Sequence, residues 1–179
     1  MRRDLEGTRT YDNIMAAFAG ESQARNKYDY FASAARKEGF EQIAAIFEET
    51  ALNEKEHAKR LAKFVGLVDT TAVNLKHAAE GENHEWTNMY PEFARVAKDE
   101  GFDDIAYVFG EIGEVEEHHE ARFGALLGNI EAGTVFKKER AVSWKCRNCG
   151  YIHEGPEAPK SCPACAHPQS YYELNVRNY

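Results

Sequence analysis

Hydrophobic residues in the first 129 positions recur at alternating steps of three and four, which is the spacing of an amphipathic α-helix. Four such segments follow one another, and glycine-containing turns join them in pairs. Gly39 and Gly101 stand where helix C-terminal glycines belong, and Gly66 is expected to end the second helix. The pattern therefore predicts two helical hairpins that form a four-helix bundle, in a mainly α protein.

The two hairpins are copies of one another. With an offset of 62 residues, positions 28–60 align with positions 90–122 without a gap, and 14 of the 33 pairs are identical. Tyr28 aligns with Tyr90, and each copy reads as helix, turn, helix. A polar side chain that recurs at equivalent positions is therefore expected to have the same role in both hairpins.

Polar side chains interrupt the apolar stripes of these helices at equivalent depths: Glu54, His57, Glu116 and His119, with Glu21 on the first helix. An unpaired buried carboxylate needs a proton or a cation. One such Glu can be a satisfied structural residue, but several Glu and two His at one depth indicate a metal site. Two Glu-x-x-His pairs, joined by one Glu from each of the other helices, are the ligand pattern of ferritin-like carboxylate proteins.

The third helix carries an irregularity at its candidate ligand, Glu82. Seven residues separate Glu21 from Tyr28, whereas eight separate Glu82 from Tyr90. The extra residue predicts a π-bulge, a feature that often marks functional sites. Glu85, three residues after Glu82, shares its face and adds a fifth carboxylate. The neighbouring residues 117 and 118 lie off the stripe and are expected on the solvent side.

Composition and charge restrict the possible functions. The 179 residues suffice for one ordinary domain and a small module stabilised by a bound metal ion. The net charge of the chain is −8. Residues 130–179 carry +2, so residues 1–129 carry −10, which argues against a nucleic-acid partner. We find neither a signal-peptide pattern nor an apolar run long enough for a membrane span. We therefore expect a cytoplasmic protein without a membrane or nucleic-acid partner.

All four cysteines lie near the end of the chain as two Cys-x-x-Cys pairs, Cys146/Cys149 and Cys162/Cys165, with twelve residues between them. This spacing can bring four thiolates to one tetrahedral zinc or iron ion. Disulfides are the weaker interpretation, because a bridge within one pair closes too small a loop to stabilise much. Trp144, Tyr151 and a closing strand over residues 171–174 are expected to form the small core around the metal.

The chain resembles the rubrerythrin family, in which a ferritin-like di-iron bundle precedes a rubredoxin-like domain. The resemblance covers nearly the whole chain, and its motifs taken together are very specific for this family. These motifs are Phe18-Ala-Gly-Glu-Ser-Gln-Ala, Glu54-Lys-Glu-His57, Gly81-Glu-Asn-His-Glu85, Glu116-Glu-His-His119, Cys146-Arg-Asn-Cys-Gly150 and Cys162-Pro-Ala-Cys165. The implied domains are a bundle over residues 1–130, a linker over 131–141 and a rubredoxin-like domain with one iron held by four cysteines over 142–179.

The resemblance implies iron at both sites and reduction of hydrogen peroxide to water as the activity. Glu54 and Glu116 would bridge the two irons of the di-iron centre, and Glu21 and Glu82 would be terminal ligands. Five ligand carboxylates nearly neutralise two ferrous ions, which is favourable where burial makes charge expensive.

The remaining roles also follow from the resemblance. His119 would bind one iron, while Glu85 and His57 would compete for the other as its oxidation state changes. Tyr28 and Tyr90 match tyrosines that lie next to the ligands in the family. The catalytic set is therefore these nine residues of the bundle.

The cysteine site would return electrons one at a time, which zinc cannot do. Because the chain has no Gly-x-Gly-x-x-Gly loop, electrons from NADH would arrive through a separate reductase or a rubredoxin. We expect a head-to-tail homodimer, in which helices can also be exchanged between subunits. Two alternatives stay open: a ferroxidase or iron-storage protein, and a non-catalytic zinc-ribbon interaction protein.

Overall fold

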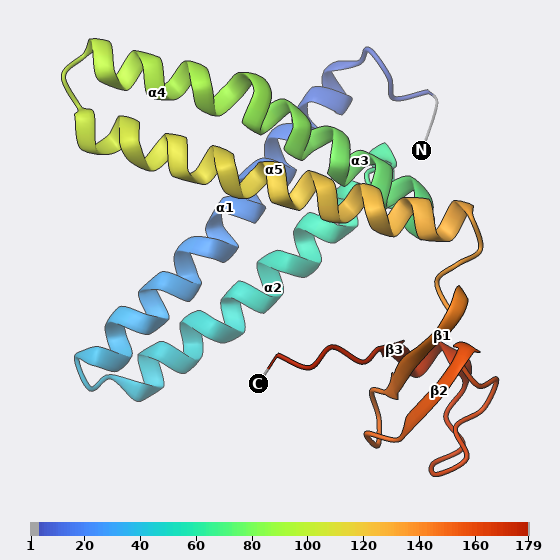
Figure 1. Cartoon of the computed structure of the whole chain (residues 1–179). Helices are drawn as coiled ribbons and strands as arrows, with labels where there is room; N and C mark the ends of the chain where they lie inside the picture. The colour runs from blue at the N-terminus through green and yellow to red at the C-terminus, as the bar shows by residue number, and fades with distance from the viewer. Residues whose placement is uncertain (1–3, 179) are drawn as a thin grey trace. The chain divides into compact units, whose positions relative to one another are not determined.

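The structure is a computed structural model that describes residues 4–178 (Figure 1). It is mainly helical, with a small antiparallel sheet near the C-terminus, as the sequence predicts. The chain divides into two compact units, and the boundary follows Thr70. This division falls between the two helical hairpins, and the domain boundaries at residues 130 and 142 stay predictions.

The first unit is a hairpin of α1 (Arg9–Lys37) and α2 (Glu41–Val65). Thr8 caps α1, because its hydroxyl accepts a hydrogen bond from the backbone N–H of Tyr11 at 3.2 Å. Gly39 turns the chain with φ of 85°, a conformation that favours glycine. The seam between the helices is made of small buried side chains, which let the helices approach closely: Ala32, Ala35, Ala44, Ala51, Ala58 and Ala62.

The second hairpin is built in the same way, but its first arm is interrupted. Its elements are α3 (Thr71–His84), the π-helix η1 (Glu85–Met89), α4 (Tyr90–Asp99) and α5 (Asp103–Glu131). The backbone N–H of Tyr90 donates to the carbonyl of Glu85, which is the five-residue step of a π-helix. The π-bulge predicted from the one-residue mismatch between the repeats is confirmed.

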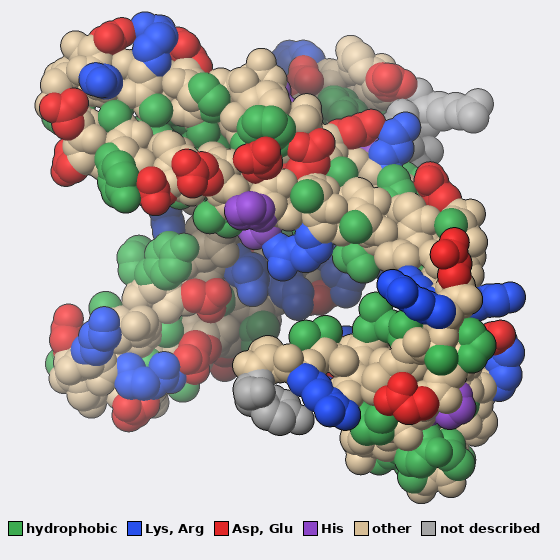
Figure 2. Space-filling view, in the orientation of Figure 1, with side chains coloured by type: hydrophobic (Ala, Val, Ile, Leu, Met, Phe, Trp, Pro, Cys, Tyr) green, Lys and Arg blue, Asp and Glu red, His purple; other side chains and the backbone are tan. Residues whose placement is uncertain are grey.

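The large apolar residues at the start of the predicted stripe are half-exposed in each hairpin. Phe40 and Ile43 are 52% and 47% exposed, and their repeat equivalents Phe102 and Ile105 are 51% and 44% exposed. Figure 2 shows hydrophobic side chains at the helix surfaces among acidic ones. Two helices bury only the sides that face each other. The buried seam is therefore formed mainly by alanine and glycine, and part of the heptad stripe remains an exposed apolar face on each hairpin.

The C-terminal sheet has the strand order β2-β1-β3, with both pairs antiparallel. Its strands are β1 (Lys137–Cys146), β2 (Ile152–Glu157) and β3 (Tyr172–Leu174), and a 3₁₀ turn, η2 (Gln169–Tyr171), precedes β3. Strand β1 begins inside the segment expected to be a linker. Only residues 132–136 therefore separate the last helix from the first strand.

The small core of the sheet consists of Trp144, Cys146, Ala158, Cys162 and Tyr172. The indole N–H of Trp144 donates to the carbonyl of Gly155 at 2.9 Å, which satisfies the one polar group of this buried ring. Tyr151 and Tyr171 are 36% and 41% exposed, so their expected place in the core is wrong. Tyr171 ends the 3₁₀ turn η2 and Tyr151 precedes β2, so neither lies in the strand that begins with the buried Tyr172.

Candidate metal centres

The first candidate group joins one side chain of α1 to two of α2. Nδ1 of His57 lies 2.8 Å from a carboxylate oxygen of Glu54 and 3.9 Å from one of Glu21. Glu54 and His57 stand three residues apart, so they project from one helix face toward Glu21 on the facing helix. One ligand atom from each residue lies within 4.8 Å of the others.

The second group repeats this geometry in the other hairpin. Nδ1 of His119 lies 2.6 Å from Glu116 and 3.8 Å from Glu82, and the three ligand atoms again fall within 4.8 Å of one another. The side chain of His119 is 33% exposed, whereas that of His57 is 60% exposed. The structure therefore brings six of the seven predicted bundle ligands, all but Glu85, together as two repeat-related Glu–Glu–His groups, one in each unit.

Glu85 is the first residue of η1 and is half-buried. Burial raises the pKa of Glu82, and the neighbouring charges of Glu116 and Glu85 raise it further. In the first group, the hydrogen bond with Glu54 and then burial raise the pKa of Glu21. Carboxylates crowded in this way favour a bound proton or a cation, so the donor set fits a metal ion.

The two tyrosines of the predicted site occupy equivalent aromatic clusters. Tyr28 packs against Phe31 and Phe47, with ring centroids 6.2 and 6.1 Å away. Tyr90 packs in the same manner against Phe93 and Phe109, at 6.4 and 6.1 Å. Burial raises the pKa of Tyr90, and the nearby carboxylate of Glu85 raises it further, so the phenol stays protonated at neutral pH.

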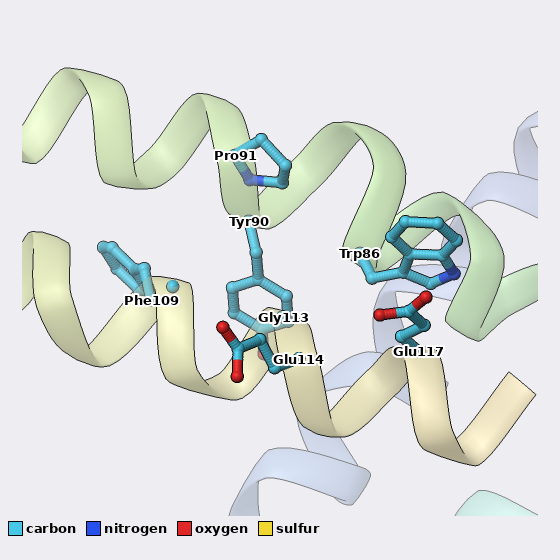
Figure 3. Close-up of a pocket in the computed structure, with 8 residues that line it drawn as sticks. Trp86, Tyr90, Pro91, Phe109, Gly113, Glu114 and Glu117 are labelled. Carbon is cyan, nitrogen blue, oxygen red and sulfur yellow. The ribbon is translucent and has the colours of Figure 1, made fainter.

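A cavity of about 160 Å³ lies beside Tyr90, between α4 and α5 (Figure 3). Tyr90 reaches across toward α5, where Gly113 leaves room for it: a Cβ on Gly113 would lie 3.4 Å from the Tyr90 Cβ. Trp86 borders the cavity next to Glu117. Glu117 and His118 are exposed, in agreement with their expected position on the solvent side.

Sequence reasoning missed one interaction close to the second group. The Trp86 indole N–H and the Asn83 amide both donate to the carboxylate of Glu120. Glu120 lies off the apolar stripe, so periodicity does not select it. The repeat carries a signal, because Glu120 aligns with Ala58 and is therefore an acidic residue that only one hairpin has.

The four cysteines form the third candidate site, and all four are free thiols. The Sγ atoms of Cys146 and Cys165 are 3.8 Å apart, and those of Cys149 and Cys162 are 3.6 Å apart. A tetrahedral metal with metal–sulfur bonds of about 2.3 Å separates its sulfurs by about 3.8 Å, so this cluster fits one ion. A hydrogen bond from the His167 backbone lowers the pKa of Cys165 to about 6, which favours the thiolate.

These features define a class of protein: a helical carboxylate metalloprotein with a small four-cysteine module. The rubrerythrin family model matches residues 12–127, and the model of the rubrerythrin rubredoxin-like domain matches residues 144–173. The chain belongs to the rubrerythrin family. Its helices are thus a ferritin-like domain and its sheet a rubredoxin-like domain, which confirms the predicted fold class.

Curated relatives match almost the whole chain. The chain is 50% identical to rubrerythrin of Porphyromonas gingivalis, covering 100% of this chain and 96% of that protein. It is 52% identical to rubrerythrin of Nitratidesulfovibrio vulgaris, with coverage of 96% and 97%. It is also 52% identical to rubrerythrin of Clostridium perfringens, with coverage of 99% and 100%.

Family membership and the donor groups together confirm iron as the predicted cofactor, with carboxylate–histidine groups and a four-cysteine cluster as its candidate ligands. The family also supports an oxidoreductase role. No helix among residues 4–178 has the length and apolar character needed to cross a membrane.

Proposed function

We propose that this protein is a non-haem di-iron peroxidase that reduces hydrogen peroxide to water, with electrons relayed through its four-cysteine iron site. One observation carries the proposal: a single chain holds two repeat-related Glu–Glu–His groups and a separate cluster of four thiolates. A ferroxidase or iron store has no use for a one-electron relay, and a zinc scaffold has no use for the crowded carboxylates.

The two Glu–Glu–His groups would supply the ligands of the iron pair. We propose Glu54 and Glu116, the less exposed carboxylate of each group, as bridging ligands. Glu21 and Glu82 would be terminal ligands, because each comes from the opposite arm of its hairpin. When bound, the iron pair supplies the two electrons needed to break the O–O bond of peroxide.

The other residues of the site would hold protons and adjust the ligand set. His119 is the more buried imidazole and suits a permanent ligand. His57 is more exposed, and Glu85 lies on the π-helix, so both can change position at little cost in packing. The hydroxyls of Tyr28 and Tyr90 would orient carboxylates, and a carboxylate or solvent would deliver the two protons that convert peroxide to two waters.

We further propose that the working assembly is a head-to-tail homodimer in the cytoplasm, with helical hairpins exchanged between subunits. Each hairpin has an apolar face, at Phe40 and Ile43 in the first and at Phe102 and Ile105 in the second. Each hairpin also carries only one of the two ligand groups. Pairing the first hairpin of one subunit with the second hairpin of another would bury both faces and complete the site.

Anaerobic purification, metal analysis and reduction, followed by peroxide or oxygen, test the proposal. We expect three irons per chain and rapid oxidation of both sites by peroxide, with electrons accepted from a separate reductase or rubredoxin. His57→Ala should slow peroxide turnover and leave the visible spectrum of the cysteine site unchanged, whereas His118→Ala, at an exposed position, should match the wild type.

Other outcomes point to the other functions. Oxygen-driven deposition of many irons would favour iron storage. Zinc at the cysteines, together with no response to reductant or peroxide, would favour the interaction module. Unchanged turnover in the His57→Ala variant would remove His57 from the site while leaving the peroxidase proposal standing.

A further inference from the structure

Tyr172 is a buried tyrosine whose hydroxyl lacks an ordinary partner. The residue begins β3, is 4% exposed, and pairs across the sheet with the metal-site residue Cys146. Within residues 4–178, its hydroxyl makes no hydrogen bond of normal geometry. Buried polar groups are nearly always hydrogen-bonded, so a hydroxyl left in this position needs an acceptor.

The thiol of Cys162 is the neighbour that interacts with this hydroxyl. Tyr172 and Cys162 belong to the same buried cluster of the rubredoxin-like domain. Burial raises the pKa of Tyr172, and the contact with the Cys162 sulfur raises it further. A phenol ordinarily has a pKa of about 10, so this hydroxyl carries its proton at neutral pH. It can therefore act only as a donor toward a negatively charged sulfur.

Metal binding supplies the missing acceptor. A cysteine bound to iron is a thiolate, and a hydrogen bond to an ionised acceptor is roughly twice as strong as one between neutral groups. The Tyr172 hydroxyl therefore gains a hydrogen-bond acceptor, the Cys162 thiolate, when iron occupies the site. The sheet holds it there, because β3 pairs with β1 from Trp144 to Cys146.

We propose that the Tyr172 hydroxyl donates a hydrogen bond to the Cys162 thiolate and raises the reduction potential of the iron held by the four cysteines. Reduction adds one negative charge to the iron–thiolate unit, so a donor aimed at a sulfur stabilises the reduced state more than the oxidised state. The donor makes the site a better acceptor of electrons from the external reductase.

Most of the other donors around the sulfurs are backbone N–H groups. Backbone N–H groups of Tyr151 and His167 contact Cys149 and Cys165, and the Asn148 side chain also contacts Cys165. Backbone donors persist whatever the side chains are. The Tyr172 hydroxyl, in contrast, depends on one oxygen atom, so this residue can adjust the potential without changing the fold.

The test is the reduction potential of the cysteine iron in the full-length, iron-loaded protein, followed by its visible thiolate-to-iron absorption during a redox titration. Tyr172→Phe removes only the hydroxyl, and we expect a potential more negative than that of the wild type. Tyr171→Phe is the matched control, because Tyr171 is adjacent and its side chain is at the surface, beside His167. Its potential should equal that of the wild type.

A Tyr172→Phe potential equal to that of the wild type, or equal shifts in both variants, would overturn the inference. Proton NMR of the zinc-loaded wild-type protein provides a second test that needs no variant. The Tyr172 hydroxyl proton should exchange slowly and lie close to the Cys162 β-protons, whereas rapid exchange with water would contradict the hydrogen bond. The inference rests on the relay role proposed above, but a potential is measured without peroxide, so the two proposals can fail separately.

Discussion

The indole N–H of Trp86 donates a hydrogen bond to the carboxylate of Glu120, and this bond ties the π-helix η1 to α5 next to His119. The Asn83 amide reaches the same carboxylate, at 3.1 Å from each oxygen. Asn83 follows Glu82 along the chain, so the carboxylate holds the segment that carries two proposed ligands. The first hairpin has Ala58 at the position equivalent to Glu120, so it cannot form these hydrogen bonds.

Replacing Glu120 should loosen the second ligand group. Residues that orient metal ligands typically contribute 10–100-fold to metal affinity or activity, and we expect Glu120→Ala to reduce iron affinity by about 10-fold. Iron content after anaerobic loading at limiting metal measures the effect. Glu114→Ala, an exposed change on the same helix, is the control and should load like the wild type. Equal iron content in the two variants would show that the hydrogen bonds to Glu120 do not position the ligands.

The raised pKa of Glu82 predicts how the metal-free protein responds to pH. Burial and then Glu116 raise this pKa, so the folded state binds the proton more tightly than the unfolded chain. The resulting stabilisation is present below the ordinary pKa of about 4.5 and is lost as the pH rises through the raised pKa. Glu82→Gln should therefore raise the melting temperature of the metal-free protein at pH 7, and the difference should disappear at acid pH.

The matched control for this experiment is Glu80→Gln, on the same helix but exposed. It should leave the melting temperature nearly unchanged, apart from loss of a weak surface pair with Lys76. A Glu82→Gln variant that melts below the wild type at pH 7 would show that the charged carboxylate stabilises the metal-free fold, contrary to the predicted sign.

Ala166 adopts a left-handed backbone conformation with φ of 59°, immediately after the second cysteine pair. Gly150 follows the first pair at the equivalent place, with φ of 79°. In each case the backbone N–H donates to the carbonyl of the first cysteine, Cys162 or Cys146, at 2.8 Å. A side chain in this conformation costs roughly 1 kcal/mol relative to glycine.

Ala166→Gly should therefore stabilise the metal-loaded protein by about 0.5–1 kcal/mol, and Gly150→Ala should destabilise it by a similar amount. Chemical denaturation, followed by the thiolate-to-metal absorption, measures both changes at the same site. Shifts of the same sign in the two variants would rule out the backbone explanation.

Complementation between two inactive chains tests the exchange of hairpins. Glu54→Ala impairs the first ligand group, and Glu116→Ala impairs the second. In a hairpin-exchanged dimer of one chain of each kind, one site receives both changes and the other receives neither. Mixed and refolded chains should then recover up to half of the wild-type activity per mixed dimer, whereas each variant alone stays inactive. Absence of any recovery in verified mixed dimers would exclude exchange.

Much of this architecture could be predicted from the sequence because it depends on local spacing. The glycines at positions 39 and 101 end helices as expected, and both have positive φ. The π-helix follows from one extra residue between Glu82 and Tyr90, which must be absorbed if both are to keep their repeat-related positions. The cysteine cluster follows from two pairs of residues at fixed separation.

The remaining features depend on contacts between side chains that periodicity does not encode. The heptad pattern identified the large apolar stripe, but the seam within a hairpin is set by small residues such as Ala44 and Gly113. The bonds to Glu120 and the surroundings of the Tyr172 hydroxyl involve residues distant in sequence. Strand β1 begins early because residue 137 pairs with Glu157, a partner that a linker composition does not reveal.

The most direct test of the peroxidase account is an anaerobic titration of the fully reduced protein with hydrogen peroxide. A chain that stores two electrons at the iron pair and one at the cysteine iron should consume about 1.5 equivalents of peroxide, because each peroxide accepts two electrons. The ferric thiolate absorption of the cysteine site should appear as the titration proceeds. A reduced protein that consumes no peroxide, or whose cysteine site stays reduced in its presence, would contradict the account.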